Sequence, residues 1–412
     1  MAQVSGQDVL DYESDPIRYS KSTPDNVVSR LNSELKAGRV KFEHDERLAY
    51  LPAALEKLKI PVSSQVLTFA QTSLQANRIS PKTPRAIYFS DDVFLGYIRG
   101  EGHGEHGPVV LELIVTDPAL GVVFYTLDQE KAEKPQFARQ ANRCLTCHGG
   151  PKTRGVPGLQ VRSVFPDSDG RPVIAAGSHR TDHTTPLNQR WGGWYVTGKH
   201  GEQNHLGNYL LPTPKKPKQV DNAAGQNVTD LSSRFDTKPY LTPHSDLVAL
   251  LVMEHQIDAI NYMTRARFEH QLAAAGKGSE SRAKEAVELL VRHLLFSGEA
   301  KLTGPVSGTS EFAAEFAKRG PTDRLGRSLR QFDLKERIFK YPLSYMVYSA
   351  AFTSLTAETK MAVYRRIGEV LTLDDAGSEY SHLTAKDKAA IREIVTETLP
   401  GLPQHWPKVA NR

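Results

Sequence analysis

The spacing of hydrophobic residues changes near residue 240, and this change limits the folds that the chain can adopt. Before it, apolar residues gather in short β-type runs, and after it they recur at the three- and four-residue spacing of helices. The β-type runs lie at residues 66–69, 86–89, 93–98, 109–115 and 122–126. Turn-forming residues follow two of these runs, at 90–92 and 117–121, so neighbouring strands can pair antiparallel. We therefore predict an α+β protein in which an antiparallel β-rich part precedes a helical part.

Helical patterns flank the β-rich part on both sides. Residues 1–60 form a predicted N-terminal helical arm with candidate helices at 25–31 and 51–58. Residues 61–230 form the β-rich domain, which also holds shorter strand-like pieces at 159–165, 173–176 and 194–197. Residues 231–412 form the helical domain, where Ser245 or Asp246 can cap a helix that runs to about Ala274. Further helices are expected at 281–296, 344–353, 357–371 and 384–399.

Composition excludes two classes of protein. The longest apolar run, Leu247 to Met253, has seven residues, whereas a bilayer span needs roughly 18 or more. Lys and Arg number 52 against 47 Asp and Glu, with no block of five like charges to form a nucleic-acid footprint. We expect neither a membrane span nor a nucleic-acid partner.

The two cysteines of the chain stand three residues apart, in Arg143-Cys144-Leu145-Thr146-Cys147-His148. On a helical turn, positions i, i+3 and i+4 share one face, so Cys144, Cys147 and His148 can act together. Two thiols and an imidazole in this order suit the covalent attachment of a haem, with the imidazole on the iron.

This motif resembles that of c-type cytochromes. The resemblance implies one covalent haem c held by Cys144 and Cys147 within the β-rich domain, with His148 as an axial ligand of the iron. The stretches at 84–89 and 191–195 are also similar to those of long single-haem cytochrome c domain proteins of bacteria. Two alternatives stay open. The cysteines could form half of a zinc site with His148 or with His179/His183 and His200/His205, or they could form a redox dithiol.

Residues after the motif supply candidates for the rest of a haem pocket. The candidate distal ligands or pocket residues are His183, His200 and His205. The candidate propionate partners are Arg143, Lys152, Arg154 and Arg162, and the candidate pocket wall is Trp191, Trp194 and Tyr195. His255 follows Leu247 and Leu251 on an apolar helix face, so we expect it to be a core histidine.

The sequence thus predicts an exported monohaem c-type cytochrome that acts in redox chemistry, most directly by electron transfer to a redox partner protein. A haem enzyme acting on a small oxidant such as peroxide or a nitrogen oxide is the alternative, and a haem-based ligand sensor is another. Because haem attachment through thioethers normally follows export, a periplasmic or otherwise exported location is expected. No apolar leader precedes the acidic segment at 8–15.

Overall fold

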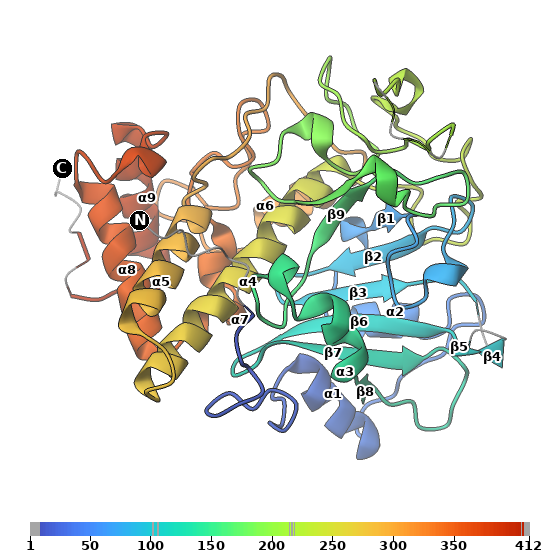
Figure 1. The fold of residues 1–412 in the computed structure, drawn as a ribbon, viewed down its shortest axis with the longest axis horizontal. Coiled ribbons are helices and arrows are strands. Elements are labelled where there is room, and N and C mark those ends of the chain that lie inside the picture. Colours follow the sequence, from blue (N-terminus) through green and yellow to red (C-terminus); the bar gives the residue numbers. More distant parts are fainter. Residues whose placement is uncertain are drawn as a thin grey trace.

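The computed structural model describes residues 9–404 except 101, 102, 105, 106, 214, 216 and 218, together with residues 406 and 407. Its centre is a seven-stranded antiparallel sheet in the order β11-β1-β2-β3-β6-β7-β8 (Figure 1). The strands are β1 Val66–Thr68, β2 Arg85–Phe89, β3 Val93–Tyr97, β6 Val110–Asp117, β7 Gly121–Asp128, β8 Ala138–Arg139 and β11 Trp194–Tyr195. Two small antiparallel sheets pair β4 His103–Gly104 with β5 Gly107–Pro108, and β9 Val161–Val164 with β10 Ser178–Thr181.

The expected antiparallel meander is confirmed from β2 to β7. The β6–β7 turn shows its chemical cause, because the Asp117 carboxylate accepts the backbone N–H groups of Ala119 and Leu120. Gly121 then starts β7 with a φ of +76°, a left-handed value that glycine adopts without strain.

Alternate side chains of the sheet enter two separate hydrophobic clusters. On β7, Val122 and Phe124 join the cluster built around the C-terminal helices, whereas Val123 and Tyr125 join the cluster that contains the N-terminal helices. This two-residue alternation is the pattern of a strand with both faces covered. The sheet therefore lies between two helical layers.

The helices lie mostly in the C-terminal part of the chain, so the α+β class is confirmed. They are α1 Val27–Lys36, α2 Leu51–Lys57, α3 Asn142–His148, α4 Leu247–Ala274, α5 Glu280–Leu294, α6 Phe312–Lys318, α7 Ala350–Thr353, α8 Ala357–Thr372 and α9 Ala385–Thr398. Asp246 caps α4 by accepting the N–H groups of Val248 and Ala249, as the sequence predicts.

Two local expectations are wrong. Residues 173–176 do not form a strand, because Ile174–Ala176 makes a 3-10 turn that leads into Gly177 and β10. The helix expected at 344–353 is instead a 3-10 turn, Tyr345–Tyr348, followed by the short helix α7. In α4, every residue from Leu247 to Asn261 is buried. A helix covered on all sides must lie inside the molecule, and α4 contacts both β7 and α5 (Figure 1). The domain boundaries stay a prediction.

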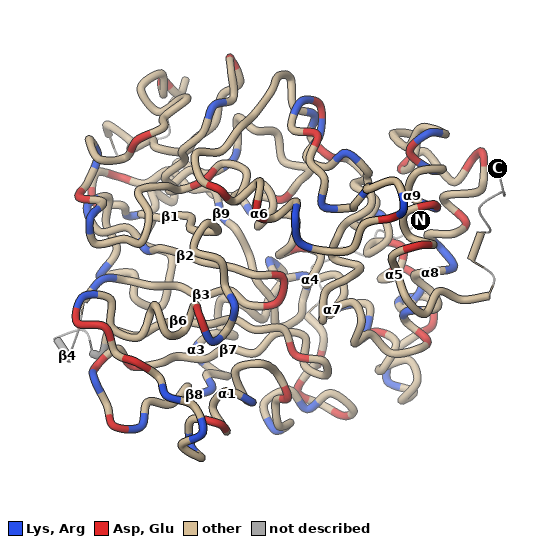
Figure 2. The backbone as a smooth tube through the Cα atoms, turned by 180° about the vertical axis from the view of Figure 1, so that it is seen from behind, with Lys and Arg blue, Asp and Glu red and all other residues tan. Residues whose placement is uncertain are grey.

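Charged residues of both signs are interspersed along the backbone in the view of Figure 2. Among the described residues, no helix is long and apolar enough to cross a membrane.

Candidate metal centre

Helix α4 carries polar side chains through the middle of the core. Glu254, His255, Asp258 and Asn261 are each at most 1% exposed. A buried polar or charged group needs partners to offset its lost hydration. The partners come from the segment around β9 and β10 and from α5, and together they make a buried polar network.

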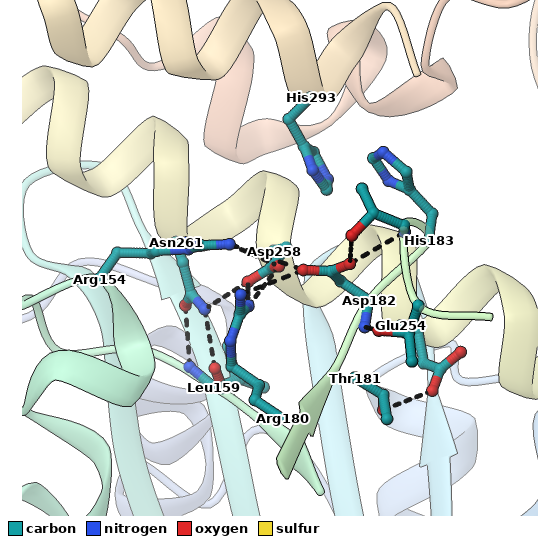
Figure 3. A network of polar contacts seen from close by, with 12 residues as sticks. Arg154, Leu159, Arg180, Thr181, Asp182, His183, Glu254, Asp258, Asn261 and His293 are labelled. Carbon is teal, nitrogen blue, oxygen red and sulfur yellow. Dashed lines mark hydrogen bonds and ion pairs between the residues drawn. The ribbon is translucent and has the colours of Figure 1, made fainter. Parts of the chain in front are cut away.

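Asp258 and Asp182 form the acidic part of this network. Arg180, on β10, bonds both carboxylate oxygens of Asp258 and lies 3.1 Å from Asp182 (Figure 3). Arg154 approaches the same pair, at 3.2 Å from Asp258 and 3.7 Å from Asp182. Although burial alone would raise the pKa of Asp182, Arg180 and the Thr184 hydroxyl hold that pKa well below its usual range.

Glu254 forms a second ion pair on the neighbouring turn of α4. Its carboxylate accepts hydrogen bonds from the Thr181 hydroxyl at 2.6 Å and from Arg190 at 3.0 Å. Burial raises the pKa of Glu254 to about 7 despite the opposing charge of Arg190. Arg190 also donates to the backbone carbonyl of His183 at 3.0 Å and thereby fixes the segment after β10.

Three histidines converge beside these ion pairs. His183 follows β10, His255 lies on α4 and His293 lies on α5, and all three are buried. One side-chain nitrogen from each ring lies within 4.8 Å of the other two. The Nδ1 atoms of His183 and His255 are 3.0 Å apart, and the rings of His255 and His293 stack with centroids 4.7 Å apart. Figure 3 shows the rings of His183 and His293 above Asp182.

The hydrogen bonds of the rings decide which nitrogens are available as ligands. His293 Nε2 lies 2.9 Å from the backbone carbonyl of His255, so Nε2 carries the proton and the neutral ring keeps a lone pair on Nδ1. His255 Nε2 lies 2.7 Å from the Ser344 hydroxyl, and that bond leaves Nδ1 facing His183. Such outer hydrogen bonds are those that orient metal-binding histidines.

Burial keeps the three rings uncharged. It lowers the pKa of His183, His255 and His293, and the neighbouring imidazoles lower the pKa of His183 and His255 further. Neutral imidazole is the form that binds metal ions. His183 Nε2 is also a buried nitrogen without a hydrogen-bond partner. The cluster thus brings three neutral imidazoles together, and the proton shared by the Nδ1 atoms of His183 and His255 has to leave that contact when a metal ion binds.

The same network reaches the cysteine-containing helix α3. Asn261 accepts the N–H of Leu159 and donates to its carbonyl, and His148 Nδ1 donates to the carbonyl of Gly158 at 2.9 Å. Gly158 is required here, since a Cβ at this position would lie 2.3 Å from the side-chain oxygen of Asn261. The backbone carbonyl of Gly158 therefore holds the His148 ring in place.

The structure separates the candidate residues that the sequence grouped around a haem. His183 joins the three-histidine cluster, whereas His200 and His205 form another buried pair with ring centroids 4.7 Å apart. Trp191 contacts His205, Trp194 donates to the Arg162 carbonyl, and Tyr195 donates to the Pro81 carbonyl. Of the candidate propionate partners, Arg143 and Lys152 are exposed, Arg162 bonds Ser178, and Arg154 belongs to the acidic network.

No family model, curated protein or solved structure matches this chain. The expected membership of the c-type cytochromes and the expected covalent haem c are corrected on this finding and on the placement of the thiols. Cys144 packs against the main hydrophobic cluster, whereas Cys147 is exposed. Cys144, Cys147 and His148 do not line the cavity between α4 and α5 or three further surface cavities of the described chain. The motif stands on a helical turn as expected, but we withdraw the haem that was inferred from it.

Sequence reasoning missed most of the three-histidine cluster. His255 was expected to be a core histidine, which describes its burial but not its neighbours, and His293 gave no signal on its own. His183, His255 and His293 are separated by 72 and 38 residues, so no short motif can connect them. The available signal was the run of polar residues within the apolar segment that starts α4.

Proposed function

We propose that this protein binds one divalent transition-metal ion through His183, His255 and His293. The observation that carries the proposal is the convergence of three buried imidazole nitrogens within 4.8 Å of one another. Outer hydrogen bonds between His255 and Ser344 and from His293 to a carbonyl support it, because such bonds orient metal-binding rings.

The donor set favours zinc among the common metals. Imidazole nitrogen suits Zn²⁺, and three protein ligands leave one position for a further ligand, as in catalytic rather than structural zinc sites. A zinc ion held here would supply Lewis-acid chemistry. The chain itself supplies the orientation of the rings through Arg190, Ser344 and the carbonyl of His255.

The test is metal analysis and titration of the purified chain. We expect one Zn²⁺ per chain after incubation and desalting, and a Co²⁺-substituted protein whose visible spectrum is that of nitrogen ligation without thiolate charge transfer. His293→Gln and His255→Gln should each lose the ion. His270→Gln, on the same helix as His255 but outside the cluster, should keep it.

A cysteine control separates this centre from the motif on α3. The double variant Cys144→Ser with Cys147→Ser should bind the ion as tightly as the unmodified protein. Loss of the ion in that variant, together with its retention in a folded His293→Gln protein, would sink the proposal. Circular dichroism of each variant shows whether a loss reflects unfolding.

Redox chemistry is the second candidate, since three imidazoles also suit copper and iron. This candidate keeps the electron-transfer function expected from the sequence. It assigns that function to the histidine cluster instead of the cysteine motif. Binding of copper in preference to zinc under competition, with reversible reduction of the bound ion, would favour it. The expected export and redox partner rested on the haem and stay predictions of the sequence.

A further inference from the structure

A cavity between α4 and α5 adjoins the histidine cluster. Its volume is about 140 Å³, and its walls include Tyr262 of α4 and Leu289 of α5. The ring of Tyr262 lies 5.2 Å from that of His293, so this tyrosine separates the cavity from the proposed metal centre. A dry cavity of about 150 Å³ can hold a benzene molecule, so the space fits a ligand of about six heavy atoms.

The cavity wall has a charged side and an apolar side. The first is lined by Arg154, Arg265 and Arg282 together with Glu269 and Glu285, and the second by Tyr262, Ala286 and Leu289. Arg154 stacks over Tyr262, with its guanidinium carbon 4.4 Å from the ring centroid, and reaches Asp258 with the other edge. A guanidinium beside apolar surface is suited to a ligand with a carboxylate head and a short hydrocarbon chain.

Charge balance around the cavity depends on the metal ion. The arginines 154, 180, 265 and 282 face four carboxylates, those of residues 182, 258, 269 and 285, so these side chains alone are balanced. A divalent ion on three neutral histidines adds two positive charges next to Asp182 and Asp258. The metal-loaded protein therefore has an excess of positive charge beside the cavity, and an anion there would reduce it.

We propose that this cavity binds a short-chain monocarboxylate beside the metal centre, and that it binds the ligand more tightly when the metal is present. The inference rests on the proposed function, because the metal ion supplies the charge that the anion offsets. By linkage, the carboxylate must also tighten metal binding by the same factor.

The experiment is calorimetric titration of the zinc-loaded and the metal-free chain with butyrate, and with butyramide as the uncharged analogue of the same size. We expect saturable binding of butyrate to the zinc-loaded chain and binding weaker by about tenfold or more for butyramide. Arg154→Gln should weaken butyrate binding by about tenfold, and Arg282→Gln, at a more exposed position, should weaken it without touching the Asp258 network. Arg171→Gln, in an exposed ion pair, is the control.

The outcomes separate this inference from the proposed function. A chain that holds zinc on its histidines yet binds butyrate and butyramide equally, or neither, overturns the cavity proposal alone. A chain that holds no metal but binds butyrate through Arg154 overturns the metal centre and with it the metal dependence of the cavity. Equal butyrate affinity with and without zinc contradicts the charge argument.

Discussion

Individual polar groups in this core matter because water cannot replace their partners. Ser344 is an example: it is buried, it lies 2.7 Å from His255 Nε2, and it also accepts the N–H of Met346. It touches no other histidine of the cluster through a hydrogen bond that the structure describes. It should therefore act as a positioning residue for one ligand.

Ser344→Ala should weaken zinc binding by about 10- to 100-fold, because the His255 ring loses the hydroxyl that orients it. The metal-free protein should lose only about 1 kcal/mol of unfolding free energy, the typical net worth of one hydrogen bond. Competition with a chromogenic chelator measures the first quantity and urea unfolding the second. Ser33→Ala, at an exposed hydroxyl of α1, is the control. Equal metal affinity in the two variants would argue against Ser344 as a positioning residue.

Asp258→Asn tests the ion-pair network on which the cluster rests. The Asp258 side chain is 1% exposed and bonds both Arg154 and Arg180, so its loss leaves the two guanidinium groups with Asp182 in place of a pair of carboxylates. Breaking such a buried pair by removing one partner typically costs about 3–5 kcal/mol of unfolding free energy. Asp169→Asn, which removes an exposed partner of Arg171, should cost at most about 1 kcal/mol in the same urea titration. A small effect at Asp258 would show that the arginines find other acceptors.

Among the elements, α4 holds the fold and the site together. Its first fifteen residues are buried, and its N-terminus is fixed by Asp246, which also accepts the N–H groups of Thr309 and Ser310. This cap therefore joins the helix to a loop far along the chain. Further along the same helix, His255 and Asp258 belong to the buried polar network.

Asp246→Ala should destabilise the protein by at least about 2 kcal/mol, because it removes the cap and leaves buried N–H groups unpaired. Ser279→Ala removes a single capping bond at the exposed start of α5 and should cost about 0.5–1 kcal/mol. Thermal or urea unfolding of the two variants compares the caps directly. Equal losses would mean that the bonds to Thr309 and Ser310 contribute nothing.

Much of the secondary structure was predictable because it depends on local sequence patterns. The Asp246 cap, the long helix to Ala274 and the meander from β2 to β7 follow from spacing and turn chemistry within a few residues. The burial of α4 on all sides did not follow, since a polar residue within an apolar run can face either solvent or a buried partner. Only the packing of α5 and β10 against α4 decides this for His255 and Asp258.

The site itself was predictable only in fragments. His183 was singled out among the histidines after the motif, but its partners lie 72 and 110 residues further along the chain. The cysteine motif drew attention because its residues are adjacent in sequence, whereas the three-histidine cluster is adjacent only in space. A single sequence does not show which distant residues become neighbours when the chain folds.

The folded protein contains buried groups whose protonation has opposite effects on its stability as the pH falls. Burial, together with nearby His200, lowers the pKa of His205 to about 3. The unfolded chain takes up a proton at this histidine below about pH 6.5, whereas the folded protein does not until about pH 3. The contribution of His205 to stability is therefore complete above pH 6.5 and declines as the pH falls toward 3.

His205→Gln removes this dependence. Relative to the variant, the unmodified protein should lose up to about 1.4 kcal/mol of unfolding free energy per pH unit between about pH 6 and 4. Urea unfolding at a series of pH values measures the difference. His270→Gln controls for the removal of an imidazole, and a difference between wild type and His205→Gln that does not change with pH would contradict the assignment.

Glu299 should show the opposite sign in the same experiment. Burial raises its pKa to about 7, against the lowering effect of the Ile338 N–H that it accepts at 2.8 Å. The folded protein therefore binds a proton at Glu299 below about pH 7, whereas the unfolded chain does so only near pH 4.5. Its contribution to stability is fully present below pH 4.5 and is lost as the pH rises to 7.

Relative to Glu299→Gln, the unmodified protein should therefore gain stability as the pH falls from 7 to 4.5, while relative to His205→Gln it should lose stability over most of that range. The double variant then shows whether the two sites act independently, because their differences add only in that case. A flat pH profile of the unmodified protein would then reflect cancellation between such groups rather than their absence. If the stability differences for His205→Gln and Glu299→Gln change with pH in the same direction, then the folded protein does not hold both a neutral His205 and a protonated Glu299.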